Sequence, residues 1–573
     1  MKIKLNDFVN GIISLVISQI LIKIFGVIYS VYLTNKTGFG DEGNAIYMSG
    51  YQIYALLLTI SSIGVPNAIS RLIAEKNGQK DIVNRERIFL IAIFLFAIIG
   101  LIGTVFLYIF SDVFANRFLE IPEATLSLKL LSPAIFFVSI SSVIKGFFNG
   151  INKIKITAKV QFIEQVIKSF LTIILVEIVS RHSNNSSSEI MAAVANFATT
   201  LATFCSMIYI LKEYTIAANI YEDKVYFKKE RIIYIVRNIL IISMPMTLNA
   251  ILSSLGKNID SITVVKILKK IIGEEDAIKK YGIISSKIDI LVSMPLSFNA
   301  SIATALIPEI TNLKAKNDIN ELVRKIKFSI LITLIIVLPY CFGIYSYSND
   351  ILNILFPNAS EGGNLLKLSA FGIIFSMLTQ TINSILQALG HNKIPVFASI
   401  IGIAFKLFSN IYLIPIEGIY EKGAIIGNVL SSFTSFLIVY YSLRKIIYLD
   451  LNLFKLSFKP ILGSIIMINF SLFIKKKLLK NYIKGTYLGL ISIAISVIIY
   501  VFFIFFMKML GKETMLENLD KSEFATLKNG KCLKNKKKLK KIKKKEGFKH
   551  ILANKIIVEQ KNDFYITLKS IRR

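Results

Sequence analysis

Long apolar runs separated by short polar connections dominate the chain. Each run approaches or exceeds the roughly 20 apolar residues that cross a bilayer as a helix. The residues do not alternate between apolar and polar, as the strands of a membrane barrel would. About fourteen runs are present, near residues 9–33, 46–72, 88–111, 127–150, 156–180, 189–212, 232–266, 281–309, 325–348, 364–390, 394–414, 422–443, 457–474 and 485–508. We therefore predict an all-α polytopic membrane protein of about fourteen transmembrane helices, with the first run retained as a helix.

One stretch of the chain occurs twice. Tyr47–Glu75 aligns with Tyr281–Glu309 without a gap, and the two copies end in SRLIAE and TALIPE. A second pair of segments, GFFNGINKI around Gly150 and LQALGHNKI around Gly390, aligns in a similar way. Six runs separate the copies, and because six is even, both halves enter the membrane in the same direction. A parallel repeat of this kind is typical of two-lobed transporters.

The repeat divides the chain into two lobes and an appendage. We expect an N-terminal lobe over residues 1–222 and a C-terminal lobe over 223–446, each with six helices. The last two apolar runs fall outside the repeat and predict an extra helix pair over 447–510. Residues 511–573 form a basic tail that contains the dense lysine segment Lys531–Lys545.

Composition and charge agree with a membrane protein and predict its orientation. Hydrophobic residues make up 54% of the chain, above the roughly 45–50% of soluble proteins. The net charge of +32 lies in loops and in the tail. Loops rich in lysine and arginine alternate with poor ones, which predicts a cell-membrane protein with both termini in the cytoplasm. The tail is expected to bind anionic lipids rather than nucleic acid, because few aromatic residues separate its lysines.

No constellation of catalytic or metal-binding residues is found in the sequence. The three cysteines and three histidines lack metal-ligand spacing, and no nucleophile elbow or phosphate-binding loop occurs. The loops are too short to hold an enzyme domain. We therefore expect a protein without a cofactor, a metal or catalytic residues. Transport driven by ATP on this chain alone is disfavoured, which leaves an ion gradient or the membrane potential.

Polar residues inside the apolar runs are the candidates for function, because charges are costly in a bilayer. Three runs carry polar residues at helical spacing, so each set lies on one helix face. The sets are Gln19, Lys23 and Ser30; Ser286, Asp289, Ser293, Ser297, Ser301 and Thr304; and Ser376, Gln380, Asn383 and Gln387. Such polar walls predict a hydrated cavity between the lobes. Hydrogen bonding between packed helices is the alternative.

Further charges extend the set of candidate residues. Glu164 and Lys168 have the spacing of a pair on one helix, and Lys257 and Asp260 are similarly placed. Lys406 has no partner on its own helix and fits either a cavity or a structural role. The candidate substrate-binding residues are Lys23, Gln19, Ser30, Lys287, Asp289, Ser293, Gln380, Asn383 and Lys406. Asp260 and Asp289 are candidates for an ion-coupling site.

Three local sequences resemble a known family. They are KIFGVIYSVYLT at Lys23–Thr34, the segment Tyr51–Asn77, and LIPEI at Leu306–Ile310. The chain resembles the polysaccharide-exporter branch of the multidrug/oligosaccharidyl-lipid/polysaccharide exporter superfamily. That branch includes stage V sporulation protein B and the MurJ-type lipid II flippases. The resemblance covers about residues 5–508.

The resemblance implies translocation of an undecaprenyl-pyrophosphate-linked glycan from the inner to the outer leaflet. By position it implies that Lys23 and Lys287 are cations that meet the pyrophosphate. Where such proteins often carry a further arginine, this chain has Tyr29 and Ser30, which leaves the glycan open. The extra helix pair would hold the polyprenyl chain, and the lobes would work by alternating access.

Three other functions remain open at this point. A drug/cation antiporter of the same superfamily would need a buried acidic ion site, for which Asp260 and Asp289 are the candidates. A membrane glycosyltransferase or glycan polymerase would need large outer loops, and the loops here are short. A non-transporting scaffold for sporulation or division would depend on the basic tail.

Overall fold

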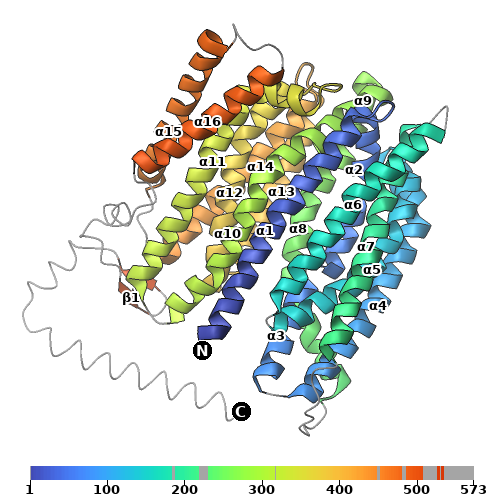
Figure 1. Cartoon of the computed structure of the whole chain (residues 1–573), viewed down its shortest axis with the longest axis vertical. Helices are drawn as coiled ribbons and strands as arrows, with labels where there is room; N and C mark the ends of the chain where they lie inside the picture. The colour runs from blue at the N-terminus through green and yellow to red at the C-terminus, as the bar shows by residue number, and fades with distance from the viewer. Residues whose placement is uncertain are drawn as a thin grey trace, which may run out of the picture.

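The computed structural model shows a long bundle of roughly parallel helices (Figure 1). It describes residues 2–62, 64–79, 81–151, 153–182, 187–218, 230–315, 318–447, 452–479, 486–507, 526–528 and 531–533.

The first helices form one side of the bundle, which we call the N-terminal lobe. Its members are α1 (Lys2–Asn35), α2 (Gly40–Ser62), α3 (Gly64–Gly78), α4 (Ile82–Val113), the π-helical turn η1 (Phe114–Leu119), α5 (Ala124–Gly150), α6 (Ile154–His182) and α7 (Ser188–Ala218). In this lobe α5 packs against α2, α4 and α7, and α6 packs against α1 and α7. The side of α4 away from α5 exposes a row of large apolar residues, as a lipid-facing helix would.

The remaining helices form the other side of the bundle. The C-terminal lobe comprises α8 (Ile232–Ile272), α9 (Glu274–Gly282), the π-helical turn η2 (Ile283–Ile288), α10 (Asp289–Ala315), α11 (Ile319–Leu355), α12 (Gly363–Ala388), α13 (Lys393–Leu413) and α14 (Glu421–Ile447). The chain then continues into α15 (Leu453–Ile474), the π-helical turn η3 (Lys475–Leu479) and α16 (Thr486–Phe506). Two short strands, β1 (Thr526–Lys528) and β2 (Lys531–Leu533), pair antiparallel.

The apolar pattern predicted the helical class correctly. Each predicted run overlaps helical residues, and nine helices among the described residues are long and apolar enough to cross a membrane. Shorter apolar helices occur at Leu21–Asn35 and Ile232–Met244. The chain is therefore an all-α integral membrane protein, while the number of its spans stays a prediction. Several helices begin before their predicted runs, among them α1 at Lys2 and α2 at Gly40. The run predicted at 281–309 continues from a helix that begins at Glu274, because three acidic residues favour its first turn.

The helix pair α15–α16 packs on the outside of α11. The Tyr347 hydroxyl on α11 lies 2.7 Å from the Ser471 hydroxyl on α15. The Tyr500 hydroxyl on α16 donates to the Ile335 carbonyl at 3.0 Å. Lys475, which begins the π-helical turn η3 after α15, forms an ion pair with Asp350 at 2.6 Å. Of the basic tail, only β1 and β2 belong to the described residues, so the segment expected to bind anionic lipids lies almost wholly outside them.

The two lobes meet closely at the end of the bundle that holds α9, which we call the α9 end (Figure 1). A Cβ added at Gly282 would lie 1.9 Å from the Asp41 carbonyl oxygen. Only glycine permits this approach of α9 to the start of α2. At the same end, the Asn35 side chain donates to the Leu355 carbonyl at 2.8 Å. The N-terminal and C-terminal lobes are therefore joined at the α9 end.

Candidate functional site

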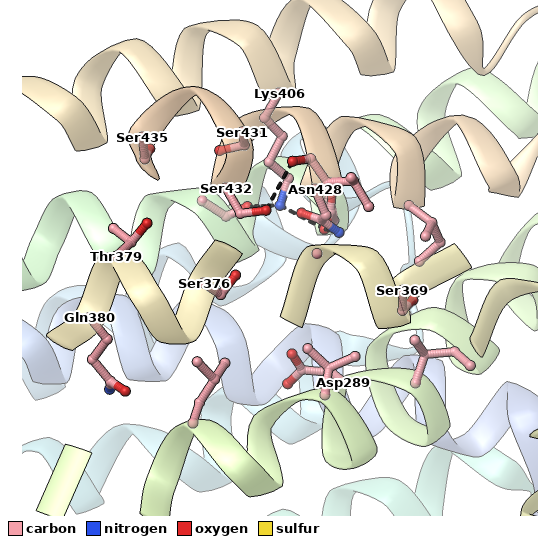
Figure 2. Close-up of a pocket in the computed structure, with 18 of the residues that line it drawn as sticks. Asp289, Ser369, Ser376, Thr379, Gln380, Lys406, Asn428, Ser431, Ser432 and Ser435 are labelled. Atoms are coloured by element: carbon pink, nitrogen blue, oxygen red, sulfur yellow. Dashed lines mark hydrogen bonds and ion pairs between the residues drawn. The ribbon is translucent and has the colours of Figure 1, made fainter. Parts of the chain in front are cut away.

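A polar cavity of about 570 Å³ lies within the C-terminal lobe (Figure 2). One wall is α12, on which residues spaced three and four apart share a helix face. The predicted row of Ser376, Gln380, Asn383 and Gln387 lines this cavity, together with Ser369, Thr379 and Ser384. Gln387 is the next-to-last residue of α12, so the cavity extends toward the end of the bundle opposite α9.

The facing wall comes from α13 and α14. It consists of Ser399, Lys406, Asn428, Ser431, Ser432 and Ser435. Hydroxyl and amide groups dominate both walls, and each of these groups donates and accepts hydrogen bonds. The cavity is therefore suited to a ligand with many hydroxyl groups rather than to an apolar one. Figure 2 shows Lys406 and Asn428 at one side of this space and Asp289 across from them.

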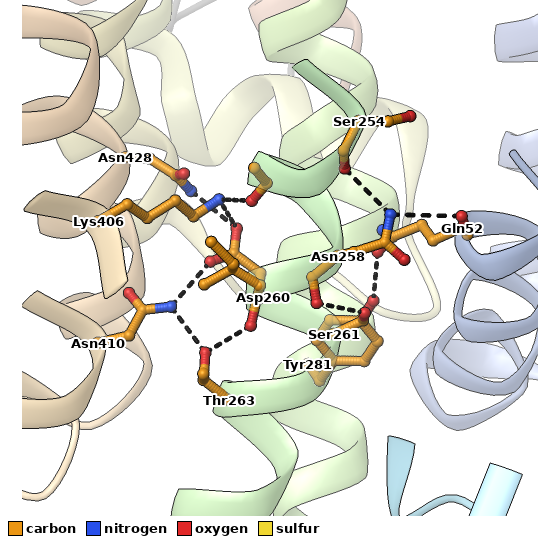
Figure 3. A network of polar contacts seen from close by, with 12 residues as sticks. Gln52, Ser254, Asn258, Asp260, Ser261, Thr263, Tyr281, Lys406, Asn410 and Asn428 are labelled. Carbon is orange, nitrogen blue, oxygen red and sulfur yellow. Dashed lines mark hydrogen bonds and ion pairs between the residues drawn. The ribbon is translucent and has the colours of Figure 1, made fainter. Parts of the chain in front are cut away.

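A charged network closes the side of the cavity formed by α8 (Figure 3). The Lys406 ammonium donates to Asp260 Oδ2 at 2.7 Å and also contacts the Gly256 carbonyl. Asn410 donates to Asp260 Oδ1 at 3.0 Å, and Asn428 donates to Asp260 Oδ2 at 3.2 Å. Asp260 is thus held by a lysine and two amides from α13 and α14.

This network changes the pairing expected from the sequence. Lys406 had no partner on its own helix, and the structure supplies Asp260 from α8. The expected neighbour of Asp260 was Lys257, whose side chain lies outside the described part of the structure. The pair joins residues 146 positions apart, so helical spacing gave no signal for it.

Gln52 connects the N-terminal lobe to this cavity. It lies on α2 and lines the cavity beside residues of the other lobe. The Tyr281 hydroxyl donates to Gln52 Oε1 at 3.2 Å, and Asn258 Nδ2 donates to the Gln52 carbonyl at 3.4 Å (Figure 3). Asn258 lies two residues before Asp260, so the charged network and the contact between lobes share one turn of α8.

The polar row predicted to begin at Ser286 contributes little to this cavity. It begins within the π-helical turn η2, and its later members lie on α10. Asp289 lines the cavity with Ser285, Val292 and Leu296, whereas Ser293 is absent from the lining. The Ser293 hydroxyl donates to the Ile290 carbonyl of its own helix at 3.2 Å. Among the members of the predicted row whose side chains the structure describes, Asp289 lines the cavity and Ser286, Ser293 and Ser297 do not.

Lys287 lies apart from the polar cavity. Its side chain is fully buried, and its ammonium pairs with Asp41 Oδ2 on α2 at 2.9 Å. It also donates to the Ala359 carbonyl at 2.7 Å. Burial raises the pKa of the Asp41 carboxyl, and the Lys287 ammonium opposes that rise. In this conformation Lys287 joins the lobes at the α9 end, which differs from the cavity position expected for it.

The polar face of α1 contacts α6 within the N-terminal lobe. Gln19 Nε2 donates to Gln161 Oε1 at 3.1 Å. Ser30 is buried, and its carbonyl accepts from Thr34 at 2.9 Å. Lys23 is half-buried. These residues do not line the cavity of the C-terminal lobe. The expected single set of site residues therefore lies at three places: the cavity, the contact of α1 with α6, and the α9 end, where Lys287 lies.

Lys168 is a buried cation surrounded by aromatic residues. Its side chain is 7% exposed. The ammonium lies 4.3 Å from the centre of the Tyr51 ring and 5.4 Å from that of Tyr29. Tyr47 stacks on Tyr51, and Tyr29 lies within electrostatic range of both Lys168 and Lys23. The two lysines thus share one region between α1, α2 and α6.

The pair expected for Lys168 does not form. Glu164 instead accepts hydrogen bonds from Ser206 at 3.1 Å and from Lys145 at 3.5 Å. Among the described residues, no carboxylate lies within ion-pair distance of Lys168. The four-residue spacing of Glu164 and Lys168 suggested that the two charges neutralise each other. Only the packing of separate helices shows that Glu164 has partners on α5 and α7, while Lys168 faces a ring from α2.

Several residues of the site were missed by sequence reasoning. Gln52 and Asn428 are uncharged and belong to none of the predicted polar rows, and Asn410 lies one turn after Lys406 on α13 without having been linked to it. The repeat did contain one usable signal. Lys168 follows the aligned segment that ends at Ile154, and Lys406 follows the copy that ends at Ile394, so each lobe places a lysine on the equivalent helix.

Comparisons with known proteins agree with this architecture. The model of the family described as polysaccharide biosynthesis protein matches residues 8–314, and the MatE family model matches residues 282–412. The lipid II flippase MurJ of Bacillus subtilis is 22% identical over 467 residues, which cover 77% of this chain and 83% of that protein. Stage V sporulation protein B of the same organism is 21% identical over 407 residues, which cover 70% and 76%.

A solved structure has the same fold. The structure of the lipid II flippase MurJ in an inward closed conformation superposes with a TM-score of 0.63 at 17% identity. The match covers 87% of this chain and all of that one. At this identity the likeness concerns the fold, and the chemistry must come from the residues of this chain.

Proposed function

The chain belongs to the polysaccharide biosynthesis protein family, within the multidrug/oligosaccharidyl-lipid/polysaccharide exporter superfamily, and we propose that it translocates a polyprenyl-pyrophosphate-linked glycan across the cell membrane. The relatives are flippases and transporters rather than enzymes, and this gives the functional class of the protein. The proposal adds the substrate: lipid II or a related precursor of the cell wall or of a polysaccharide.

The surroundings of Lys168 carry this proposal. An ammonium buried without a carboxylate is costly, and aromatic rings repay only part of that cost. A region of this kind favours an anionic ligand. A pyrophosphate carries about two charges and binds cations strongly where water is scarce. Lys23 lies on the same helix as Tyr29 and acts on it electrostatically, and we propose it as a second cation.

The cavity of the C-terminal lobe fits the other part of such a substrate. A glycan headgroup presents many hydroxyl groups, and the walls of α12 and α14 present serine, glutamine and asparagine. Gln52 and Tyr281 lie where this cavity meets the N-terminal lobe. We place the pyrophosphate in the N-terminal lobe, the glycan toward the C-terminal lobe, and the polyprenyl chain in lipid beside α15 and α16.

The contacts at the α9 end suit alternating access. With the predicted orientation, this end faces outward, and the bonds of Asp41 to Lys287 and of Asn35 to Leu355 close it. Substrate would enter from the cytoplasmic side. Separation of α2 from α9 would then open the outer side and release the headgroup. The driving force is an ion gradient or the membrane potential.

The antiporter alternative has less support from the site. The MatE match favours it at the level of fold. A drug/cation antiporter would need a buried carboxylate available to an ion, and Asp260 is bonded to Lys406, Asn410 and Asn428. The hydroxyl-rich cavity is also unlike a site for apolar drugs.

The test is complementation in cells depleted of their own lipid II flippase, with lipid II exposure at the outer leaflet as the readout. The wild-type chain is expected to restore exposure. Lys168→Met should lower it by roughly tenfold to a hundredfold, because a charge-assisted contact contributes about 1.5–3 kcal/mol.

Lys159→Met is the matched control. Lys159 lies on the same helix and also over a tyrosine ring, 5.2 Å from the centre of Tyr209, but it is exposed. Its loss should leave translocation unchanged. Equal activity of the Lys168→Met and wild-type chains at equal membrane levels would refute the pyrophosphate site. Failure of the wild-type chain to expose lipid II would leave another lipid-linked glycan to be tested in the same format.

A further inference from the structure

We infer that the Lys406 ammonium is a tethered cation that occupies, at Asp260, the place that a soluble coupling cation would take. The statement about coupling rests on the proposed function. The statement about the site rests on the geometry alone. The proposed role of Lys406 is to make transport independent of a soluble cation bound in the C-terminal lobe.

The oxygen atoms around the ammonium are those that would bind an alkali cation. Asp260 contributes its carboxylate and Gly256 its backbone carbonyl, and both contact Nζ of Lys406. The Thr263 hydroxyl lies in the same network through Asn410, at 2.8 Å from Nδ2. Carboxylate, carbonyl and hydroxyl oxygens on a membrane helix are the usual ligands of a transported monovalent cation. Here a side chain of the protein fills that position.

Asn410 adds an independent observation. The residue is fully buried, and its Oδ1 atom has no hydrogen-bond partner in the described structure. Its Nδ2 group faces Asp260 instead. Rotation of this amide would exchange Oδ1 and Nδ2, so that the unpaired oxygen would face Asp260. The site therefore holds an unused oxygen ligand that an ammonium does not require and a metal cation would use.

Charge balance explains why a second cation is excluded. Asp260 and Lys406 neutralise each other, and both are almost fully buried. A sodium or potassium ion beside Asp260 would meet the fixed positive charge of Lys406 at close range, in surroundings that screen charge poorly. A soluble ion can bind only when the ammonium is removed.

The position of the pair links it to the movement of the lobes. Asp260 on α8 is held to α13 by Lys406 and to α14 by Asn428. Two residues before Asp260, Asn258 donates to Gln52 of the N-terminal lobe. A soluble cation could leave and loosen these helices during a cycle. A tethered ammonium keeps the three helices joined throughout, so the C-terminal lobe moves as one body.

The experiment compares purified protein in lipid nanodiscs in sodium chloride and in N-methyl-D-glucamine chloride at equal ionic strength. Thermal unfolding of the wild-type protein should be the same in both salts. Lys406→Met should unfold at a lower temperature without sodium and recover by a few degrees with it, because binding to the folded state stabilises it. Potassium and lithium should be compared in the same series.

The double variant Asp260→Asn, Lys406→Met is the control, since it removes the carboxylate as well as the ammonium. It should not respond to sodium. Lys406→Gln provides a second single variant that keeps a hydrogen bond to Asp260 if the methionine variant does not fold. The inference is overturned if the wild-type protein is stabilised by sodium, or if folded Lys406→Met or Lys406→Gln responds to none of the three cations.

Transport gives a separate readout. If the proposed function holds, reversal of the sodium gradient across vesicles should leave glycan-lipid translocation by the wild-type protein unchanged. Translocation that requires sodium would overturn the coupling statement. An absence of translocation under every condition would contradict the proposed function, while the nanodisc result would still decide the nature of the Lys406 site.

Discussion

Two buried lysines, one in each lobe, have opposite surroundings. Lys406 contacts a carboxylate and a carbonyl, whereas Lys168 faces the rings of Tyr29 and Tyr51. Both follow equivalent segments of the repeat. Lys406 is therefore neutralised by a carboxylate, whereas no carboxylate among the described residues pairs with Lys168. Under the proposed function, this difference separates a structural or coupling role from a binding role.

A third buried cation, Lys287, allows a test of the contact between lobes. Lys287→Met leaves the Asp41 carboxylate without its counter-ion, and we expect the free energy of unfolding to fall by about 3–5 kcal/mol. Both side chains are shielded, at 0% and 14% exposure. The measurement is unfolding of the purified protein in detergent.

The double variant Asp41→Asn, Lys287→Met should recover most of this loss, because it leaves no buried charge uncompensated. A double variant as unstable as the single one would show that the pair itself contributes little. In that case, the packing of Lys287 would account for the effect.

At the scale of elements, the π turn η2 and the close approach at Gly282 define how α9 and α10 meet α2. The turn includes Lys287 and directs it to Asp41, and two residues later Asp289 lines the cavity. Asp289 and Ser293 both follow the turn and lie on α10, so the turn separates Asp289 from Lys287 rather than from Ser293. Within two residues the chain thus changes from a contact between the lobes, at Lys287, to the wall of the cavity, at Asp289.

Gly282→Ala should disrupt this packing. The added methyl group would lie 1.9 Å from the Asp41 carbonyl oxygen, and backbone atoms must move to accommodate it. We expect a loss of about 1–3 kcal/mol in the free energy of unfolding.

The comparison variant is Gly343→Ala on α11, where nothing lies within 4 Å of the added atom. Its effect should stay within about 1 kcal/mol and be favourable, because alanine is the better helix former. Equal destabilisation by the two substitutions would argue against a close contact between α9 and α2.

At the scale of the whole molecule, the two lobes meet at the α9 end. Hydrogen bonds there join α2 to η2, and join Asn35 of α1 to the last residue of α11 and to Asn358 after it. The cavity extends toward the opposite end, at Gln387 and Ser399. Under the proposed function, this arrangement is one state of an alternating-access cycle. The direction of transport depends on which end faces the cytoplasm, and that is predicted only by the loop charges.

Cysteine labelling tests the orientation. In a variant without Cys205, Cys341 and Cys532, we introduce Glu361→Cys at the α9 end and Gln79→Cys at the opposite end, both at exposed positions. A membrane-impermeant maleimide should label position 361 in intact cells and position 79 only after permeabilisation. The reverse pattern would invert the predicted topology and the direction of transport with it.

The sequence by itself determined the helical class, the positions of the apolar runs and the repeat. These properties reflect local regularities: enough apolar residues to cross a bilayer, and equal spacing in two copies. The row on α12 was also readable, because an uninterrupted helix keeps residues three and four apart on one face.

Only the tertiary structure decided which charges meet. Lys406 pairs with Asp260 across 146 residues, and Lys287 pairs with Asp41 across 246. Lys168 does not pair with Glu164 on its own helix, because Ser206 and Lys145 hold that carboxylate. Helical spacing describes neighbours along one helix, whereas in a bundle the partner of a buried charge is set by how separate helices pack. The same packing divided the expected single cavity into a cationic region in one lobe and a hydroxyl-rich cavity in the other.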